Sequence, residues 1–145
     1  MNNPITSRVQ LINYETYYNA FIRPKIETID LYLKENSAPF HVYDVAHILE
    51  IEIDELTTHM QNLNIDELNP ITFFSIVLSS SSEICKLLSR QWRYTNLERY
   101  TPEIVAEIYQ LNLHKVQLAF DDLNLSQITN QALGEIFKRI HLTVF

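Results

Sequence analysis

The chain has 145 residues, of which 46% are hydrophobic, 20% charged and 11% aromatic. A chain of this length and hydrophobicity buries a real core, so the composition excludes a disordered protein. The single cysteine, Cys85, excludes an internal disulfide and a CxxC zinc site. The single glycine excludes the Gly-rich phosphate-binding loops. A formal net charge of −7 argues against a generally basic nucleic-acid binder.

The sequence shows neither a signal peptide nor a membrane span. Its first residues lack a basic segment followed by an apolar stretch. The longest apolar run, residues 71–78, is far shorter than the roughly 20 residues that cross a bilayer. We therefore expect a cytoplasmic protein without membrane contact. The abundance of Ile, Asn and Tyr is typical of an AT-rich genome, as in many bacteria and phages.

Hydrophobic periodicity predicts an all-α fold, a compact bundle of about seven helices in one domain of residues 1–145. A soft boundary is expected near residues 66–70, with residues 1–66 on one side and 67–145 on the other. The first predicted helix covers residues 11–33, whose apolar side chains recur three or four residues apart. Pro24 interrupts this helix, so we expect a kink or two abutting helices there.

This long amphipathic first helix has two open interpretations. Its apolar stripe is either core or a self-association surface, because aromatic residues are favoured at interfaces. The candidate self-association residues are Tyr14, Tyr18, Phe21, Ile22 and Ile29.

Shorter helices follow. Residues 43–49 and 53–63 form a pair, with Asp54 as the expected N-cap of the second helix. Another helix begins at Asn69–Pro70, breaks at the four serines of residues 79–82 and restarts at Glu83. Further helices are expected from Thr101, around residues 116–123 and from Thr129, and the last residues, 141–145, are β-prone.

Residues 40–64 resemble the middle of a helix-turn-helix. A short helix carrying the small residue Ala46 precedes a tight turn closed by Ile51, and residues 54–56 open the second helix. The segment departs from the family pattern at Glu50, where a glycine is common. The resemblance spans about a sixth of the chain and implies the local fold and a DNA-binding role.

The charge around this segment argues against that role. None of the 11 Lys and Arg residues lies between Glu35 and Cys85, an interval with nine acidic residues. A recognition helix must approach phosphates, which Lys and Arg neutralise. We therefore expect this region to be a scaffold or a protein-docking surface. Its candidate acidic partner face consists of Asp44, Glu50, Glu52, Asp54 and Glu55.

Positive charge is concentrated directly downstream. Lys86, Arg90 and Arg93 have helical spacing, and Arg99 follows them, with Trp92, Tyr94 and Tyr100 interleaved. Cations mixed with aromatics are typical of a nucleic-acid or anion surface. The alternative, which we favour, is that these residues pair with the acidic segment within the chain or across a dimer.

No residue pattern indicates catalysis. Glu55 and His59 give two ligands on one helix, which is too few for a metal site. Cys85 lies near a predicted helix start, where the helix dipole lowers a thiol pKa, but no basic partner frames it. The serines of residues 79–82 lack the glycines of a nucleophile elbow. We expect no enzymatic activity, no cofactor and no metal.

The sequence thus favours a small intracellular regulatory or adaptor protein that acts through protein contacts. Its acidic face is the candidate surface for a basic protein partner, and its first helix is the candidate surface for a homodimer. The alternative is a DNA-binding transcriptional regulator whose basic helix contacts phosphates, with two such helices brought together in a dimer. A more distant third reading is an acidic DNA mimic that blocks a nucleic-acid enzyme.

Overall fold

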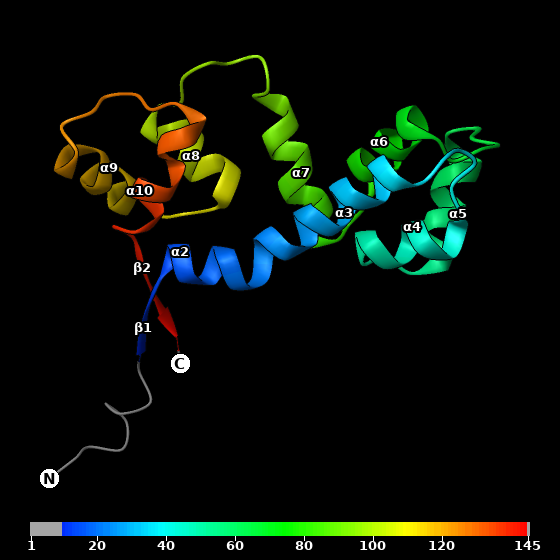
Figure 1. The fold of residues 1–145 in the computed structure, drawn as a ribbon, viewed down its shortest axis with the longest axis horizontal. Coiled ribbons are helices and arrows are strands. Elements are labelled where there is room, and N and C mark those ends of the chain that lie inside the picture. The colour runs from blue at the N-terminus through cyan, green and yellow to red at the C-terminus, as the bar shows by residue number, and fades with distance from the viewer. Residues whose placement is uncertain (1–9, 145) are drawn as a thin grey trace, which may run out of the picture. The chain divides into compact units, whose positions relative to one another are not determined.

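The computed structural model describes residues 10–144 and is mostly helical, as the sequence predicts (Figure 1). The chain divides into two units. Unit 1 consists of Met1–Phe21 and Thr95–Phe145, and unit 2 consists of Ile22–Tyr94. The segment of residues 66–70 lies inside unit 2, where the backbone N–H of Phe40 donates to the carbonyl of the buried Leu68 at 2.7 Å.

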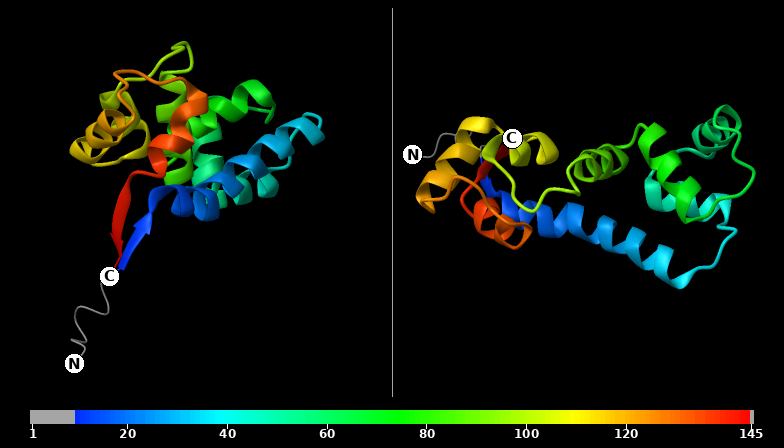
Figure 2. Two further views of the ribbon diagram at one scale, coloured as in Figure 1. Left: turned by 60° about the vertical axis from the view of Figure 1, so that its left-hand side comes forward. Right: turned by 90° about the horizontal axis from the view of Figure 1, so that it is seen from above.

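Unit 1 combines helices with a two-stranded sheet. Its elements are β1 (Gln10–Asn13), α2 (Tyr14–Tyr17), α8 (Pro102–Tyr109), α9 (Leu113–Asp122), a 3₁₀ turn (Asn130–Ala132), α10 (Leu133–Phe137) and β2 (His141–Val144). The strands lie side by side and antiparallel, with Asn13 opposite His141 (Figure 2). The expected helix start at residue 11 is therefore wrong, because residues 10–13 pair with the β-prone end of the chain. The side chain of Asn13 accepts from the N–H of Glu15 at 2.9 Å, and α2 begins after this cap.

Unit 2 is helical. Its elements are α3 (Arg23–Glu35), α4 (Val42–Leu49), α5 (Ile53–Asn62), α6 (Pro70–Ser79) and α7 (Glu83–Arg93). The Asn69 side chain forms a capping box with Thr72 at the start of α6, and the hydroxyl of Ser82 caps α7. The expected N-cap at Asp54 is wrong, because the last extended residue before α5 is Glu52.

The long N-terminal helical segment has the predicted irregularity at Pro24. A π-helical turn, Tyr18–Ile22, joins α2 to α3, and Pro24 lies at the start of α3. Proline lacks the N–H that the preceding turn needs and crowds the carbonyl four residues before it, so a wider turn relieves both problems. The boundary between the two units falls at the end of this turn.

Each unit contains one copy of the same structural motif. The first copy, residues 40–80, and the second copy, residues 100–140, are related by a constant offset of 60 residues: α4 matches α8, and α5 begins and ends as α9 does. Each copy has two non-glycine residues with left-handed backbone at equivalent positions: Glu50 (φ 57°) and Asn64 (54°), and Gln110 (54°) and Asn124 (56°).

Backbone hydrogen bonds repeat with the same offset. The bond from Phe40 N–H to Leu68 C=O, 2.7 Å, has its equivalent between Tyr100 and Ile128 at 2.8 Å. The turn between the paired helices is closed by matching bonds, from Ile51 to Ala46 at 3.1 Å and from Leu111 to Ala106 at 3.0 Å. The copies therefore share loops and caps as well as helices.

Many equivalent positions are buried in both copies. The matched buried pairs are Val45/Val105, Ala46/Ala106, Leu56/Val116, Leu68/Ile128, Phe73/Leu133, Ile76/Ile136 and Val77/Phe137. Few residues are identical between the copies: Val45/Val105, Ala46/Ala106, Ile48/Ile108, Leu63/Leu123, Asn64/Asn124 and Ile76/Ile136. The motif is therefore specified mainly by which positions are apolar and which turn left-handed.

Candidate functional site

The turn between α4 and α5 exposes most of the predicted acidic face. The side chains of Asp44, Glu50, Glu52 and Asp54 are exposed. Two of them have neighbours in unit 2: Lys25 Nζ lies 3.0 Å from a Glu50 oxygen, and the Tyr32 hydroxyl donates to Asp44 at 3.3 Å. Pairs as exposed as that of Lys25 and Glu50 are weak, so the acidic face remains open to a partner.

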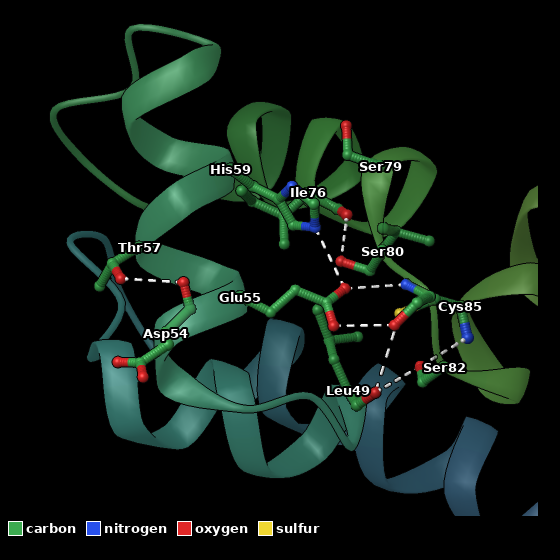
Figure 3. A network of polar contacts seen from close by, with 12 residues as sticks. Leu49, Asp54, Glu55, Thr57, His59, Ile76, Ser79, Ser80, Ser82 and Cys85 are labelled. Carbon is green, nitrogen blue, oxygen red and sulfur yellow. Dashed lines mark hydrogen bonds and ion pairs between the residues drawn. The ribbon is translucent and has the colours of Figure 1, made fainter.

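The carboxylate of Glu55 is engaged within unit 2 (Figure 3). One oxygen accepts from the Ser81 N–H at 2.9 Å and lies 3.1 Å from His59 Nε2, while the other accepts from the Ser81 hydroxyl at 2.8 Å. The Ser81 hydroxyl is the main reason that the pKa of Glu55 is lowered, with further support from the Ser81 N–H and from His59. Glu55 therefore fastens α5 to the α6–α7 connection and is not a free member of the acidic face.

The serine cluster near Cys85 is also structural. Ser80 Oγ donates to the Ile76 carbonyl at 2.6 Å, and Ser82 Oγ donates to the Leu49 carbonyl at 2.6 Å. Burial raises the pKa of the Cys85 thiol. This is opposite to the lowering expected at a helix start, because loss of hydration disfavours the thiolate. These hydroxyls act as anchors between α4, α6 and α7.

The two potential metal ligands noted in the sequence do not form a metal site. Glu55 and His59 bind each other. Within residues 10–144, no group of three or more His, Cys, Asp or Glu side chains is arranged to hold a metal ion.

The basic residues do not form one continuous helical stripe. Lys86, Arg90 and Arg93 lie on α7, where Lys86 Nζ is 3.7 Å from the exposed carboxylate of Glu83. Arg99 follows α7 in the chain and belongs to unit 1, so it does not extend the helix. The helical part of the predicted surface is therefore limited to three cations.

The predicted self-association residues have different environments. Tyr14 is buried in unit 1, where its ring packs on Phe137 at 4.8 Å, and Ile29 is buried in unit 2. Tyr18 and Ile22 are half-buried, and Phe21 has an exposed ring. Burial within the units removes Tyr14 and Ile29 from any contact surface, and self-association through Phe21 stays a prediction.

A surface groove recurs in both copies, at the open end of the helical pair. The first groove, about 360 Å³, and the second groove, about 760 Å³, are lined by equivalent residues. Their apolar lining pairs are Val42/Pro102, Met60/Phe120 and Ile65/Leu125. Their polar lining pairs are Thr57/Gln117, Gln61/Asp121, Asn64/Asn124 and Asp66/Ser126.

These grooves were not predicted from the sequence, because the 60-residue repeat that contains them was not recognised there. Two short signals mark the repeat: Val-Ala-x-Ile at residues 45–48 and 105–108, and Leu-Asn at residues 63–64 and 123–124. Each signal is too common to be convincing alone, and only their equal spacing connects them.

No single helix of the described residues is long and apolar enough to cross a membrane. The pair α6 and α7, bent by 110°, passes that test only when its helices are combined, by length and composition alone. No protein-family model, curated protein or solved structure matches the chain. The case for a function therefore rests on the residues and their geometry.

Proposed function

We propose that this chain is a small intracellular regulatory adaptor, without enzymatic activity, that binds a positively charged protein through the acidic face of Asp44, Glu50, Glu52 and Asp54. One observation carries this proposal: in both copies of the motif, the second helix of the pair is acidic. A helix-turn-helix that binds DNA places this helix against phosphates, so its charge discriminates between a nucleic-acid and a protein partner.

The charges of the two second helices support this view. Helix α5 contains no Lys or Arg and carries Asp54 and Glu55. The one cation of α9, Lys115, donates to the carbonyl of His141 at 2.8 Å. The same helix ends in Asp121, which is exposed, and Asp122, which is paired with Arg139 at 2.7 Å. A phosphate brought to either helix meets repulsion from the exposed carboxylate of Asp54 or Asp121, whereas a Lys or Arg of a protein partner is attracted to it.

Affinity capture with charge-reversed variants tests the proposal. The immobilised full chain is exposed to a nuclease-treated lysate of its source cells, and captured proteins are identified and purified. The E52K/D54K variant reverses two exposed charges of the acidic face, and E27K/E98K makes the same charge change at exposed positions outside it. We expect a basic partner whose affinity falls by about tenfold or more with E52K/D54K alone.

Two outcomes contradict the proposal. One is a purified partner that binds the wild type and E52K/D54K equally. The other is a partner that is captured from an untreated lysate but not from the nuclease-treated one, because nucleic acid then bridges the two proteins.

A DNA-binding regulator is the second candidate, and the helix α7 favours it. Lys86, Arg90 and Arg93 recur on this helix at i, i+4 and i+7, the spacing of one helical face. For a DNA-binding protein, the R90A/R93A variant lowers affinity for all duplex sequences and reduces the salt dependence by roughly one unit for each lost phosphate contact.

A further inference from the structure

We propose that the first and second grooves are two equivalent peptide-binding sites. Each takes a short extended segment of a protein partner in which one large apolar side chain is next to a Lys or Arg. This inference rests on the proposed function, since it requires a protein partner. It goes further by naming a second contact region in each copy and the chemistry of the segment that binds there.

The apolar part of each groove defines the first requirement. Met60 and Ile65 are half-buried in the first groove, and Phe120 is buried beneath the second, with Leu125 exposed beside it. Volumes of about 360 and 760 Å³ lie in the range of sites that hold small ligands, roughly 300–1,000 Å³. A Leu or larger side chain that enters a groove covers Met60 and Ile65 in the first copy, or Leu125 in the second, and so removes apolar surface from water.

The polar edge of each groove suits an extended peptide. Asn64 and Asn124 are exposed and hold the same left-handed backbone at the same place, with φ values of 54° and 56°. Their amides, together with exposed Gln61 and Gln117, offer both donors and acceptors beside the apolar surface. A peptide backbone presents the complementary N–H and C=O groups along its length.

Charge defines the second requirement. Asp66 lies at the edge of the first groove and Asp121 at the edge of the second, and both are exposed. Among the described residues that line the two grooves, none is Lys or Arg. A cation on the partner is therefore attracted, and an anionic ligand such as nucleic acid is repelled.

The chemical character of the groove lining is the same in the two copies. At all seven lining positions, an apolar residue matches an apolar one and a polar residue a polar one. The exposed side of the third helix behaves differently, since Ile71 is matched by Gln131 and Leu78 by Lys138. The apolar positions of the groove, most of them half-buried, thus keep their class, whereas these more exposed apolar positions of the third helix do not.

An NMR titration of the ¹⁵N-labelled full chain tests this inference. The probe is the peptide acetyl-Ala-Arg-Leu-Arg-Ala-amide. One control peptide replaces both Arg by Glu, and another replaces Leu by Ala. We expect amide shifts concentrated at residues 60–66 and 120–126, with an affinity about tenfold higher for the probe than for either control. Shifts spread evenly over the chain, confined to one groove, or equal for the three peptides overturn the inference.

Single charge reversals make each groove the control of the other. Asp66→Lys should abolish the shifts at residues 60–66 and leave those at 120–126 unchanged, and Asp121→Lys should do the opposite. An unfolded variant loses its whole spectrum and is thereby distinguished from a loss of binding. If either reversal leaves its own groove's shifts intact, or removes the shifts at both grooves of a folded chain, the assignment of two independent sites is wrong.

This test and the test of the proposed function fail separately. If the probe binds both grooves while E52K/D54K has no effect on a captured partner, the grooves stand and the acidic face is refuted. If the partner depends on Glu52 and Asp54 but no probe shifts appear at the grooves, the proposed function stands and the present inference is refuted.

Discussion

The two copies of the motif share a frame and differ in what packs on their third helix. In unit 1, α10 packs on α2, where Phe137 meets Tyr14 and a Cβ added at Gly134 would lie 3.6 Å from the Glu15 carboxylate. The added Cβ would make only an ordinary van der Waals contact with that side chain, so the approach of α2 does not require a glycine here. In unit 2, the position equivalent to Gly134 is Phe74, whose ring packs on Trp92 of α7 at 4.3 Å.

The features that specify the motif are shared by the two copies, whereas the surroundings of the third helix differ between them. The helical pair, its positions with left-handed backbone and most of its buried apolar positions are shared by both units. The packing partner of the third helix, and the exposure of its outer face, are not. Ile71 and Leu78 on α6 are 81% and 57% exposed, whereas the matching residues on the second copy are polar or charged. Any difference in function between the units is therefore expected outside the shared frame.

The largest losses of stability should come from substitutions of core residues that both copies share. Ile76 and Ile136 are fully buried at equivalent positions. Ile76→Ala and Ile136→Ala should each lower the free energy of unfolding by about 2–5 kcal/mol, because each leaves a cavity in a closed core. Hydrogen exchange, read separately for residues 40–80 and 100–140, measures the loss in each unit. The exposed Ile71→Ala serves as the control, with a change within about 0.5 kcal/mol. If one of the two core variants is tolerated, the copies are not equivalent.

An intermediate effect is expected at Glu55, a feature of the first copy alone, since the matching residue is Lys115. Glu55→Gln keeps the shape, but both hydrogen bonds with Ser81 lose the carboxylate charge that strengthens them, which should cost about 1–3 kcal/mol for the two bonds together. Glu50→Gln, which weakens only the exposed pair with Lys25, should cost less than about 1 kcal/mol. Urea denaturation of both variants checks this order, and equal losses would show that the Ser81 contacts add no stability.

The Glu55 carboxylate makes the stability of unit 2 depend on pH, and the direction of this dependence follows from its pKa. The pKa of Glu55 is lower in the folded chain than in the unfolded chain, mainly because of the Ser81 hydroxyl. Its contribution is therefore complete above the unfolded pKa and is lost as the pH falls through the folded one. The stability difference between the wild type and Glu55→Gln should shrink as the pH falls below about 4.3. A difference that is constant from pH 7 to pH 3 would contradict this origin.

The smallest effects concern the turn of the helical pair. Glu50 and Gln110 hold left-handed backbone, which costs a residue with a Cβ about 1–2 kcal/mol relative to its preferred conformation. Glu50→Gly and Gln110→Gly should each raise the free energy of unfolding by up to about 1 kcal/mol, with the smaller gain at Glu50, which also gives up Lys25. Thermal denaturation measures both, and Asn64→Gly is the control, because Asn tolerates this conformation. Destabilisation by both Gly variants would mean that their side chains contribute more than the strain removes.

Local patterns predicted most helices because caps and periodicity act over a few residues. Asn69, Ser82 and Thr101 each precede a helix as expected, because their side chains accept hydrogen bonds from the first free N–H groups of that helix. The helix start at residue 11 was mistaken because the partner strand lies more than 120 residues away in the chain. Periodicity over a short window carries no information about such a pairing.

The candidate sites were less predictable for the same reason. Glu55 looked like one more surface acid, since nothing in its local sequence shows that Ser81 lies beside it. The grooves require the αL residues Asn64 and Asn124 to bring a loop against two helices, which is a tertiary arrangement. The acidic character of α5, by contrast, follows from composition and was available from the start.

Fluorescence anisotropy with a random-sequence DNA duplex tests most directly the claim that this helical pair serves protein contact and not DNA. The full chain, at a known oligomeric state, is titrated at low and at moderate salt. We predict no binding at either salt concentration, because both second helices are acidic. Micromolar binding that weakens steeply with salt, and that R90A/R93A reduces, would contradict the account and establish α7 as a DNA-contacting helix.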